Sequence, residues 1–279
     1  MSSVSPLVLA LVLGSALLHA TWNAMLRSGA DRLWSISVMC AISAAAAAPF
    51  VLILPAPAAA SWPYVGLSTA LQIGYCLFLV RAYRDGLLSQ VYPIARGAAP
   101  LLVAAGAAAF AGERLSGHAI LGLTLVSCGI MTLGLGRDRP DIRSTAAAVL
   151  SGAFIAGYMV TDGVGVRLSG HPTSYVVWMS LVQGAPMPFV YLIARRRFPN
   201  VQLDRELAKS VAGGVISLVA YGIVVWAMST TDMAKVSGLR ETSILFATII
   251  GALFLKEPMT LTRGVCAVVI STGAILLAG

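Results

Sequence analysis

Charged side chains are scarce in this sequence. Asp, Glu, Lys and Arg make up 11% of its 279 residues, whereas hydrophobic residues make up 58%. A soluble domain carries roughly 25% charged residues, because its surface faces water. So few charges cannot cover a water-facing surface of this size, which excludes an ordinary soluble domain. We therefore expect much of the protein surface to face lipid.

Cysteine and histidine are also few. The four cysteines lie inside apolar runs with no Cys-x-x-Cys pair, and His19, His118 and His171 lie in three separate segments. This distribution predicts small buried thiols rather than disulfides or metal ligands, so we expect no metal and no cofactor. The patterns His-Glu-x-x-His and Gly-x-Ser-x-Gly are absent as well, so we expect no enzyme. Because side chains from distant segments can meet, an intramembrane enzyme stays the alternative from another class.

What the chain has instead is long apolar runs. A helix of about 20 mostly apolar residues crosses a hydrocarbon core of roughly 30 Å. The sequence contains ten such runs, at 5–26, 33–54, 62–82, 87–110, 118–135, 144–166, 174–194, 207–228, 233–255 and 260–278. No Lys or Arg precedes the first run, so we expect it to be retained as a helix rather than cleaved as a signal. We predict an all-α protein that crosses the cell (inner) membrane ten times.

The basic residues are distributed unevenly between the breaks. The formal net charge is +8, and we attribute it to loops that orient helices and meet lipid headgroups, not to nucleic-acid binding. Fourteen basic residues follow odd-numbered runs: Arg27, Arg32, Arg81, Arg84, Arg137, Arg139, Arg143, Arg195, Arg196, Arg197, Arg205, Lys209, Lys256 and Arg263. Three follow even-numbered runs: Arg114, Arg167 and Lys235. Since cytoplasmic loops carry the basic excess, we expect both termini outside the cytoplasm.

The sequence repeats itself at an offset of 144 residues. GERLSGHAILGLTLVSCGIMTLG begins at Gly112, and KEPMTLTRGVCAVVISTGAILLA begins at Lys256. At the same offset, Arg96 is equivalent to Arg240. Although identity between the copies is low, the matched helix breaks and charges support this register.

Each half of the chain holds five predicted helices, in residues 5–135 and 144–279. Because five is odd, the second half enters the membrane from the opposite side. This predicts two inverted-topology repeats around a central cavity, the architecture through which many secondary transporters alternate access. Two halves in one chain can enclose that cavity, so we expect a monomer.

These features resemble a known family. Ten helices arranged as five plus five, with GERLS after the fourth run and KEPMT after the ninth, resemble the EamA-type members of the drug/metabolite transporter superfamily, and HATWNAMLR in the first run is similar to that family too. The second copy departs from the pattern, with Lys256 in place of Gly and Pro258 in place of Arg. The resemblance implies a transporter, expected to be an exporter, of small metabolites. Aromatic amino-acid exporters are among the better-known members.

Polar and aromatic side chains within the runs are the candidate substrate-binding residues. Polar groups are costly in hydrocarbon, so they face the bundle interior or a wet cavity. Several share one helical face at i, i+3 or i+4 spacing, and the others lie deep in their runs. The candidates are His19, Trp22, Asn23, Gln72, Tyr75, Phe78, Tyr92, Arg96, Tyr158, Asp162, Trp178, Tyr221, Arg240 and Glu241.

Several of these side chains have structural alternatives. The face of His19 either lines a cavity or joins two helices, and His19 is also a candidate proton carrier because imidazole titrates near neutral pH. Pro93 and Pro100 weaken the backbone hydrogen bonds of the fourth run near Arg96. A broken helix beside a charge is how many transporters build a midplane site. Glu113, at a helix break, is expected to cap a helix or pair with a loop cation.

Two arginines and two acids lie within the runs, and the sequence does not decide which arginine pairs with which acid. Arg96 with Glu241 and Arg240 with Asp162 are alternative pairs. Arginines among many aromatic residues suit a substrate with a carboxylate and an apolar body. We therefore expect amino acids, including aromatic ones, as substrates. An organic cation, which favours an unpaired buried acid, and a sugar phosphate, which favours clustered Lys and Arg, are the alternatives.

Overall fold

The computed structural model describes residues 3–27, 31–84, 88–134, 142–196, 204–254 and 260–279, in which the regular structure is entirely helical. The helices are α1 (Pro6–Arg27), α2 (Arg32–Val51), the 3₁₀ helix η1 (Ala59–Ser61), α3 (Trp62–Arg84), α4 (Leu88–Ala111), α5 (Gly117–Gly134), α6 (Ile142–Leu168), α7 (Pro172–Gly184), α8 (Pro186–Arg195), α9 (Arg205–Met228), α10 (Met233–Arg240), α11 (Ser243–Phe254) and α12 (Leu261–Ala278).

The long helices follow the apolar runs. Counting α7 with α8 and α10 with α11 as interrupted spans, the described helices agree with all ten predicted runs to within three residues at each end. Nine spans in the described residues are long and apolar enough to cross a membrane, and α3 is the predicted span outside that set. Large apolar side chains such as Phe110 and Ile193 are exposed on the outer surface. In water this surface would be unfavourable, whereas in a bilayer it faces lipid.

Two spans are interrupted, and neither interruption lies where the prolines of the fourth run predicted one. Helix α4 runs without a break through Pro93 and Pro100. In the second half, α10 ends at Arg240 and α11 starts at Ser243, so the break falls beside a buried arginine and involves no proline. The break between α7 and α8 precedes Pro186, which stands at the first position of α8, where a missing N–H costs nothing.

Polar residues begin several helices at one end of the molecule. The carboxylate of Asp31 accepts hydrogen bonds from the N–H groups of Leu33 and Trp34 at the start of α2. Asp204 and Thr260 cap α9 and α12 in the same way. These caps satisfy backbone donors that a helix leaves unpaired.

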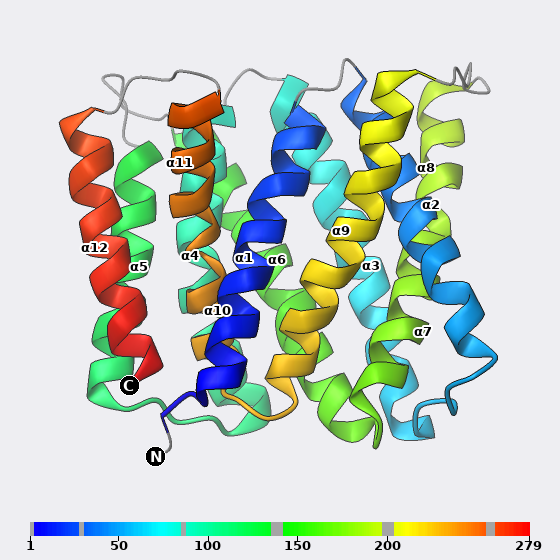
Figure 1. Ribbon diagram of the computed structural model, residues 1–279, viewed down its shortest axis with the longest axis horizontal. Helices are drawn as coiled ribbons and strands as arrows, with labels where there is room; N and C mark the ends of the chain where they lie inside the picture. The colour runs from blue at the N-terminus through cyan, green and yellow to red at the C-terminus, as the bar shows by residue number, and fades with distance from the viewer. Residues whose placement is uncertain (1–2, 28–30, 85–87, 135–141, 197–203, 255–259) are drawn as a thin grey trace.

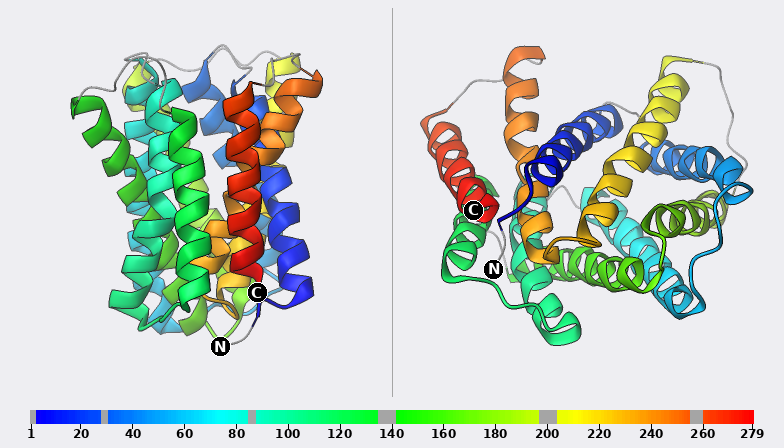
Figure 2. Two further views of the ribbon diagram at one scale, coloured as in Figure 1. Left: turned by 90° about the vertical axis from the view of Figure 1, so that its left-hand side faces the viewer. Right: turned by 60° about the horizontal axis from the view of Figure 1, so that its bottom comes forward.

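The two chain termini lie together at the opposite end, which is the bottom in Figure 1. The N–H of Val4 donates to the carbonyl of Ala278 at 3.1 Å. Helices α5 and α12 pack against each other at one side of the bundle, and α2, α7 and α8 lie at the other side (Figures 1 and 2). Helices α1, α4, α6, α9 and α10 lie between these groups and carry most of the buried core.

Candidate functional site

A cavity of about 130 Å³ lies among α1, α2, α3, α4, α6, α7, α9 and α10. It is lined by His19, Trp22, Asn23, Leu26, Ile36, Met39, Cys40, Ser43, Gln72, Tyr75, Cys76, Tyr92, Arg96, Tyr158, Ser180, Gln183, Gly184, Ser217, Leu218, Tyr221 and Arg240. The lining residues of α1 and α3 belong to the later part of each helix, and those of α2 and α4 to the earlier part. The cavity is therefore displaced toward the end of the bundle away from the chain termini.

Most of the candidate residues meet at this cavity. Ten of the fourteen line it: His19, Trp22, Asn23, Gln72, Tyr75, Tyr92, Arg96, Tyr158, Tyr221 and Arg240. Phe78 packs against Phe154, and Trp178 packs against Trp62, both away from the cavity. Asp162 and Glu241 lie behind the wall, each bonded to a side chain that lines the cavity.

Arg96 has a carboxylate partner. Its Nε lies 2.9 Å from Oε2 of Glu241, and both side chains are almost completely buried. Its Nη2 also donates to the hydroxyl of Ser243 at 3.3 Å. Of the two pairings that the sequence left open, this is the one that forms. The pair joins α4 to the break between α10 and α11, and it neutralises the charge of Arg96 at the cavity wall.

Arg240 has no carboxylate partner within 4 Å in the described part of the chain. Its Nη2 donates to Nδ1 of His19 at 3.3 Å, its Nη1 lies 3.5 Å from the sulfur of Met159, and its guanidinium lies 5.4 Å from the centre of the Tyr221 ring. The residue is 5% exposed. The groups that contact this buried guanidinium are thus neutral, and no carboxylate of the described residues forms an ion pair with it.

The contact with Arg240 also sets the tautomer of His19. A guanidinium has donors and no acceptor, so Nδ1 of His19 must accept the hydrogen bond. The neutral ring then carries its proton on Nε2, which is buried and has no partner among the residues that the structure describes. Protonation of Nδ1 would place two donors against each other, so the geometry disfavours His19 as a proton carrier in this state.

A second unpartnered polar atom belongs to Gln72 on α3. Its Oε1 is buried and accepts no hydrogen bond within the described residues. Unpaired buried polar groups are costly, and at a cavity wall they mark positions where a ligand or water completes the hydrogen bonding. Two residues of the wall, His19 and Gln72, thus hold a buried N–H and a buried carbonyl oxygen that lack a partner among the described residues.

Aromatic rings form a continuous surface beside these polar atoms. The ring centres of Tyr75 and Tyr158 are 6.1 Å apart, and those of Tyr158 and Tyr221 are 5.8 Å apart. On α1, the rings of His19 and Trp22 are 5.0 Å apart and nearly perpendicular. These spacings are typical of favourable aromatic pairs. The surface offers apolar area to a flat or branched solute.

The selection from the sequence missed several polar lining residues. Ser180 and Gln183 on α7, and Ser43 and Ser217 on α2 and α9, contribute to the wall. The hydroxyl of Ser43 donates to the carbonyl of Gly214 at 2.7 Å, which joins α2 to α9. A serine in an apolar helix bonds its own backbone as readily as a ligand, so the sequence signal for such residues is weak. No group of three or more His, Cys, Asp or Glu that suits a metal ion occurs within the described residues.

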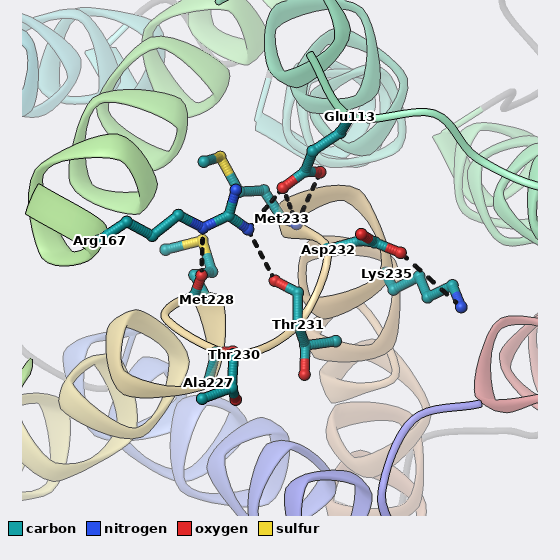
Figure 3. Close-up of polar contacts among 9 residues, drawn as sticks. All are labelled: Glu113, Arg167, Ala227, Met228, Thr230, Thr231, Asp232, Met233 and Lys235. Carbon is teal, nitrogen blue, oxygen red and sulfur yellow. Dashed lines mark hydrogen bonds and ion pairs between the residues drawn. The ribbon is translucent and has the colours of Figure 1, made fainter. Parts of the chain in front are cut away.

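The end of the bundle that holds the termini is tied together by a second polar network (Figure 3). Arg167 at the end of α6 binds the carboxylate of Glu113 at 2.6 Å and the carbonyls of Met228 and Thr231 at 2.9 Å each. The same carboxylate accepts the N–H of Met233 at the start of α10. One arginine and one glutamate thus connect α6, the α4–α5 loop, α9 and α10.

Comparisons with known proteins agree with this architecture. Residues 143–279 match the model described as the EamA-like transporter family. A solved structure described only as "Crystal structure of protein" has a TM-score of 0.76 and 17% sequence identity, and the similarity covers 97% of this chain and 94% of that one. At this identity the likeness shows the fold alone. No curated protein matches the chain.

Proposed function

Since residues 143–279 form a domain of the EamA-like transporter family, whose members are transporters and not enzymes, we propose that the chain carries small carboxylates of the amino-acid type, aromatic ones included, across the cell (inner) membrane. The family match supports transport as the class of activity, and the resemblance of the sequence to EamA-type transporters suggests export. The substrate has to be argued from the cavity.

Arg240 is the observation that carries the proposal. A buried cation without a charged partner is destabilising by several kcal/mol unless an anion accompanies it. The guanidinium lines the cavity, and the described part of the wall contains no Asp or Glu. A substrate carboxylate placed here would gain a charge-assisted contact with a planar fork of donors.

The other features of the wall fit the remainder of an amino acid. The free Oε1 of Gln72 suits an ammonium donor, and the rings of Tyr75, Tyr158 and Tyr221 suit an apolar side chain. One water molecule needs roughly 10–15 Å³ of cavity volume. The cavity of about 130 Å³ therefore holds on the order of ten water-sized groups. That is the size of an ordinary amino acid.

The alternatives fit the wall less well. An organic cation would meet Arg240 and no carboxylate on the described wall, which is repulsive. A sugar phosphate carries up to two charges on its phosphate, whereas Arg240 is the only arginine of the described wall without a carboxylate partner, because Arg96 is already paired with Glu241. The cavity therefore favours a monoanionic or zwitterionic solute.

In alternating access, the cavity would open at one end of the bundle to take up the solute and then at the other end to release it. We place the closed end at the Glu113–Arg167 network, opposite the side toward which the cavity is displaced. The basic loops assign that closed end, with both termini, to the outer side of the membrane. An active alkaline phosphatase fusion and a dark green-fluorescent-protein fusion at Gly279 are the expected result, and the reverse pattern would refute this orientation.

Two inverted repeats, residues 5–135 and 144–279, would supply the two interchangeable ends. Close glycine contacts support the pairing: a Cβ at Gly122 would lie 2.7 Å from the carbonyl of Gly273, and one at Gly129 would lie 3.5 Å from that of Cys266. At the offset of 144, each contact maps onto the other with its partners exchanged. That reciprocity is typical of a twofold relation between halves, and one chain then encloses the cavity as a monomer.

The test is uptake by purified protein in liposomes. Labelled phenylalanine, leucine and threonine serve as solutes, with a cationic dye and a sugar phosphate as competitors. Arg240→Met is expected to lose about 2–5 kcal/mol of carboxylate binding, a rise in half-saturation of roughly thirtyfold or more. Arg195→Met is the matched control, since Arg195 pairs with Asp31 at a solvent-exposed position where an ion pair contributes little. Unchanged uptake by well-folded Arg240→Met would eliminate the anchor role.

A further inference from the structure

Asp162 on α6 lies outside the cavity, yet one side chain separates it from the solute. Its carboxylate is fully buried. The hydroxyl of Tyr221, which lines the cavity, donates to Oδ2 at 2.6 Å, and the hydroxyl of Tyr175 donates to Oδ1 at 3.2 Å. A carboxylate in the apolar interior is thus held by two phenols and by no basic side chain within 4 Å among the described residues.

The groups around Asp162 come from three of the helices that pack on α6. Helix α7 contributes Tyr175 and Gln183, α9 contributes Tyr221, and α3 contributes Ser68, whose hydroxyl accepts from Gln183 at 2.8 Å. All four are neutral.

Four basic residues of α6 and its neighbouring helices are engaged elsewhere. Arg96 on α4 pairs with Glu241, Arg240 on α10 contacts His19, and Arg167 at the end of α6 binds Glu113. Lys235 on α10 lies 3.8 Å from Asp232. None of them neutralises Asp162, so its charge is balanced only at longer range.

We infer that Asp162 is a proton-binding site coupled to the substrate, so that the protein carries a proton together with each carboxylate. The inference rests on the proposed carriage of a carboxylate at Arg240. Tyr221 joins the two sites, because its hydroxyl binds Asp162 and its ring faces the guanidinium of Arg240.

The sign of the coupling follows from charge. In the empty protein, the positive charge of Arg240 favours an ionised Asp162. A carboxylate bound to Arg240 neutralises that charge, and the loss of the nearby positive charge favours a protonated Asp162. Because coupling between two sites is reciprocal, a protonated Asp162 strengthens carboxylate binding by the same factor. Proton and carboxylate then travel in the same direction, and efflux of a carboxylate down its own gradient takes protons out with it.

The proton has a route through Tyr221. The phenol transfers its hydroxyl proton to Oδ2 of Asp162 while its oxygen accepts a proton from the cavity. The carboxylate becomes a carboxylic acid that donates back to the phenol, the phenol stays neutral, and one proton has left the cavity. Tyr175 cannot perform this exchange, since it is completely buried and does not line the cavity.

The experiment records solute and proton in the same liposomes. Labelled phenylalanine, leucine or threonine is added outside, and a pH-sensitive dye reports inside. We expect internal acidification with uptake, and a half-saturation concentration that falls by up to about tenfold per unit of decreasing pH for one coupled proton. The assay runs between about pH 5.5 and 7, where the carboxylate of the solute stays ionised.

Three outcomes are distinguishable. Solute flux by the wild-type protein without any proton movement overturns the proton site and leaves the proposed function intact, whereas no flux of any of these solutes contradicts the proposed function itself. We expect folded Asp162→Asn to lose the proton movement, and proton movement as in the wild type would overturn the assignment.

The two phenols provide a second test in case Asp162→Asn fails to fold. Tyr221→Phe keeps the ring beside Arg240 and removes the relay hydroxyl, whereas Tyr175→Phe removes the buried hydroxyl. Slower proton movement in Tyr221→Phe than in Tyr175→Phe is the expected result. Equal effects in both variants would mean that the phenols only hold the helices together, and would overturn the relay.

Discussion

Arg96 and Arg240 occupy equivalent positions in the two proposed repeats, 144 residues apart, and the fold gives them different neighbours. Glu241, directly after Arg240, binds Arg96. The position equivalent to Glu241 in the first repeat is Gly97, where a Cβ would lie 2.6 Å from the side chain of Met131. No glutamate fits there. Arg96 therefore joins two helices through an ion pair, and Arg240 is the arginine that we propose binds the ligand.

This comparison teaches that burial alone does not identify a binding residue. Both guanidiniums are buried, and both line the cavity. What distinguishes them is the charge of the partner, which comes from another part of the chain.

The same substitution at the two arginines should have opposite consequences for stability. Arg96→Met leaves Glu241 as an uncompensated buried charge, and we expect a loss of about 3–5 kcal/mol in the free energy of unfolding. Arg240→Met leaves no unpaired carboxylate, so it should be neutral or stabilising. Thermal denaturation of both purified variants measures this. The double variant Arg96→Met with Glu241→Met should regain most of the loss, and equal stability of the two single variants would remove the distinction.

A conservative change at Arg240 sharpens its role. Arg240→Lys keeps the charge but loses the planar fork. Losing one hydrogen bond to a charged group corresponds to roughly 1.5–3 kcal/mol, so we expect uptake of phenylalanine to weaken about tenfold to a hundredfold. Liposome uptake at several concentrations gives the half-saturation. If lysine serves as well as arginine, the anchor acts as a point charge and the bidentate geometry is wrong.

Helices α5 and α12, one from each half of the chain, approach each other closely through glycines. A Cβ at Gly273 on α12 would lie 2.6 Å from the carbonyl of Gly122 on α5, whereas one at Gly264 on the same helix would meet nothing within 4 Å. We expect Gly273→Ala to destabilise the protein by about 1–3 kcal/mol, as overpacking usually does. Gly264→Ala is the control and should stabilise by up to about 1 kcal/mol. Thermal denaturation separates them, and equal behaviour would argue against a tight crossing.

The Glu113–Arg167 contact lies at one end of the bundle, and we expect its removal to have the smallest effect of these changes. Glu113 accepts from Arg167 and from the N–H of Met233, and Arg167 is partly exposed. Glu113→Gln keeps an acceptor and removes the charge, so we expect a shift of about 1 kcal/mol toward opening at the end that holds the termini. A thiol-specific reagent applied from that side should label Thr231→Cys faster in the Glu113→Gln background. Identical labelling rates would show that the ion pair does not keep this end closed.

The helices themselves were predictable from the sequence. Segments of about 20 apolar residues have few ways to satisfy their backbone in lipid other than as helices, and the breaks with charge or proline mark their ends. The candidate residues on α1 were also recognisable, because His19, Trp22 and Asn23 share one face at helical spacing. Local periodicity is sufficient for such predictions.

The pairing of charges and the place of the broken helix were not predictable. The sequence allowed Arg240 to pair with Asp162, but Asp162 binds two phenols and Arg240 contacts His19. Pro93 and Pro100 pointed to a break in α4, whereas the break lies after Arg240, where Glu241 turns back to Arg96. Phe78 and Trp178 looked like wall residues, and each packs on another aromatic ring instead.

Hydrophobicity and helical spacing are properties of neighbouring residues, so the order of amino acids was enough to predict a bundle of helices that crosses a membrane. The fold in three dimensions was needed to see that Arg96 is neutralised, that Nδ1 of His19 faces Arg240 and that Asp162 lies behind Tyr221. Those facts depend on groups brought together from α1, α4, α6, α9 and α10. In a medium of low dielectric, electrostatic energies change with a few ångströms of separation, and no sequence spacing specifies that separation.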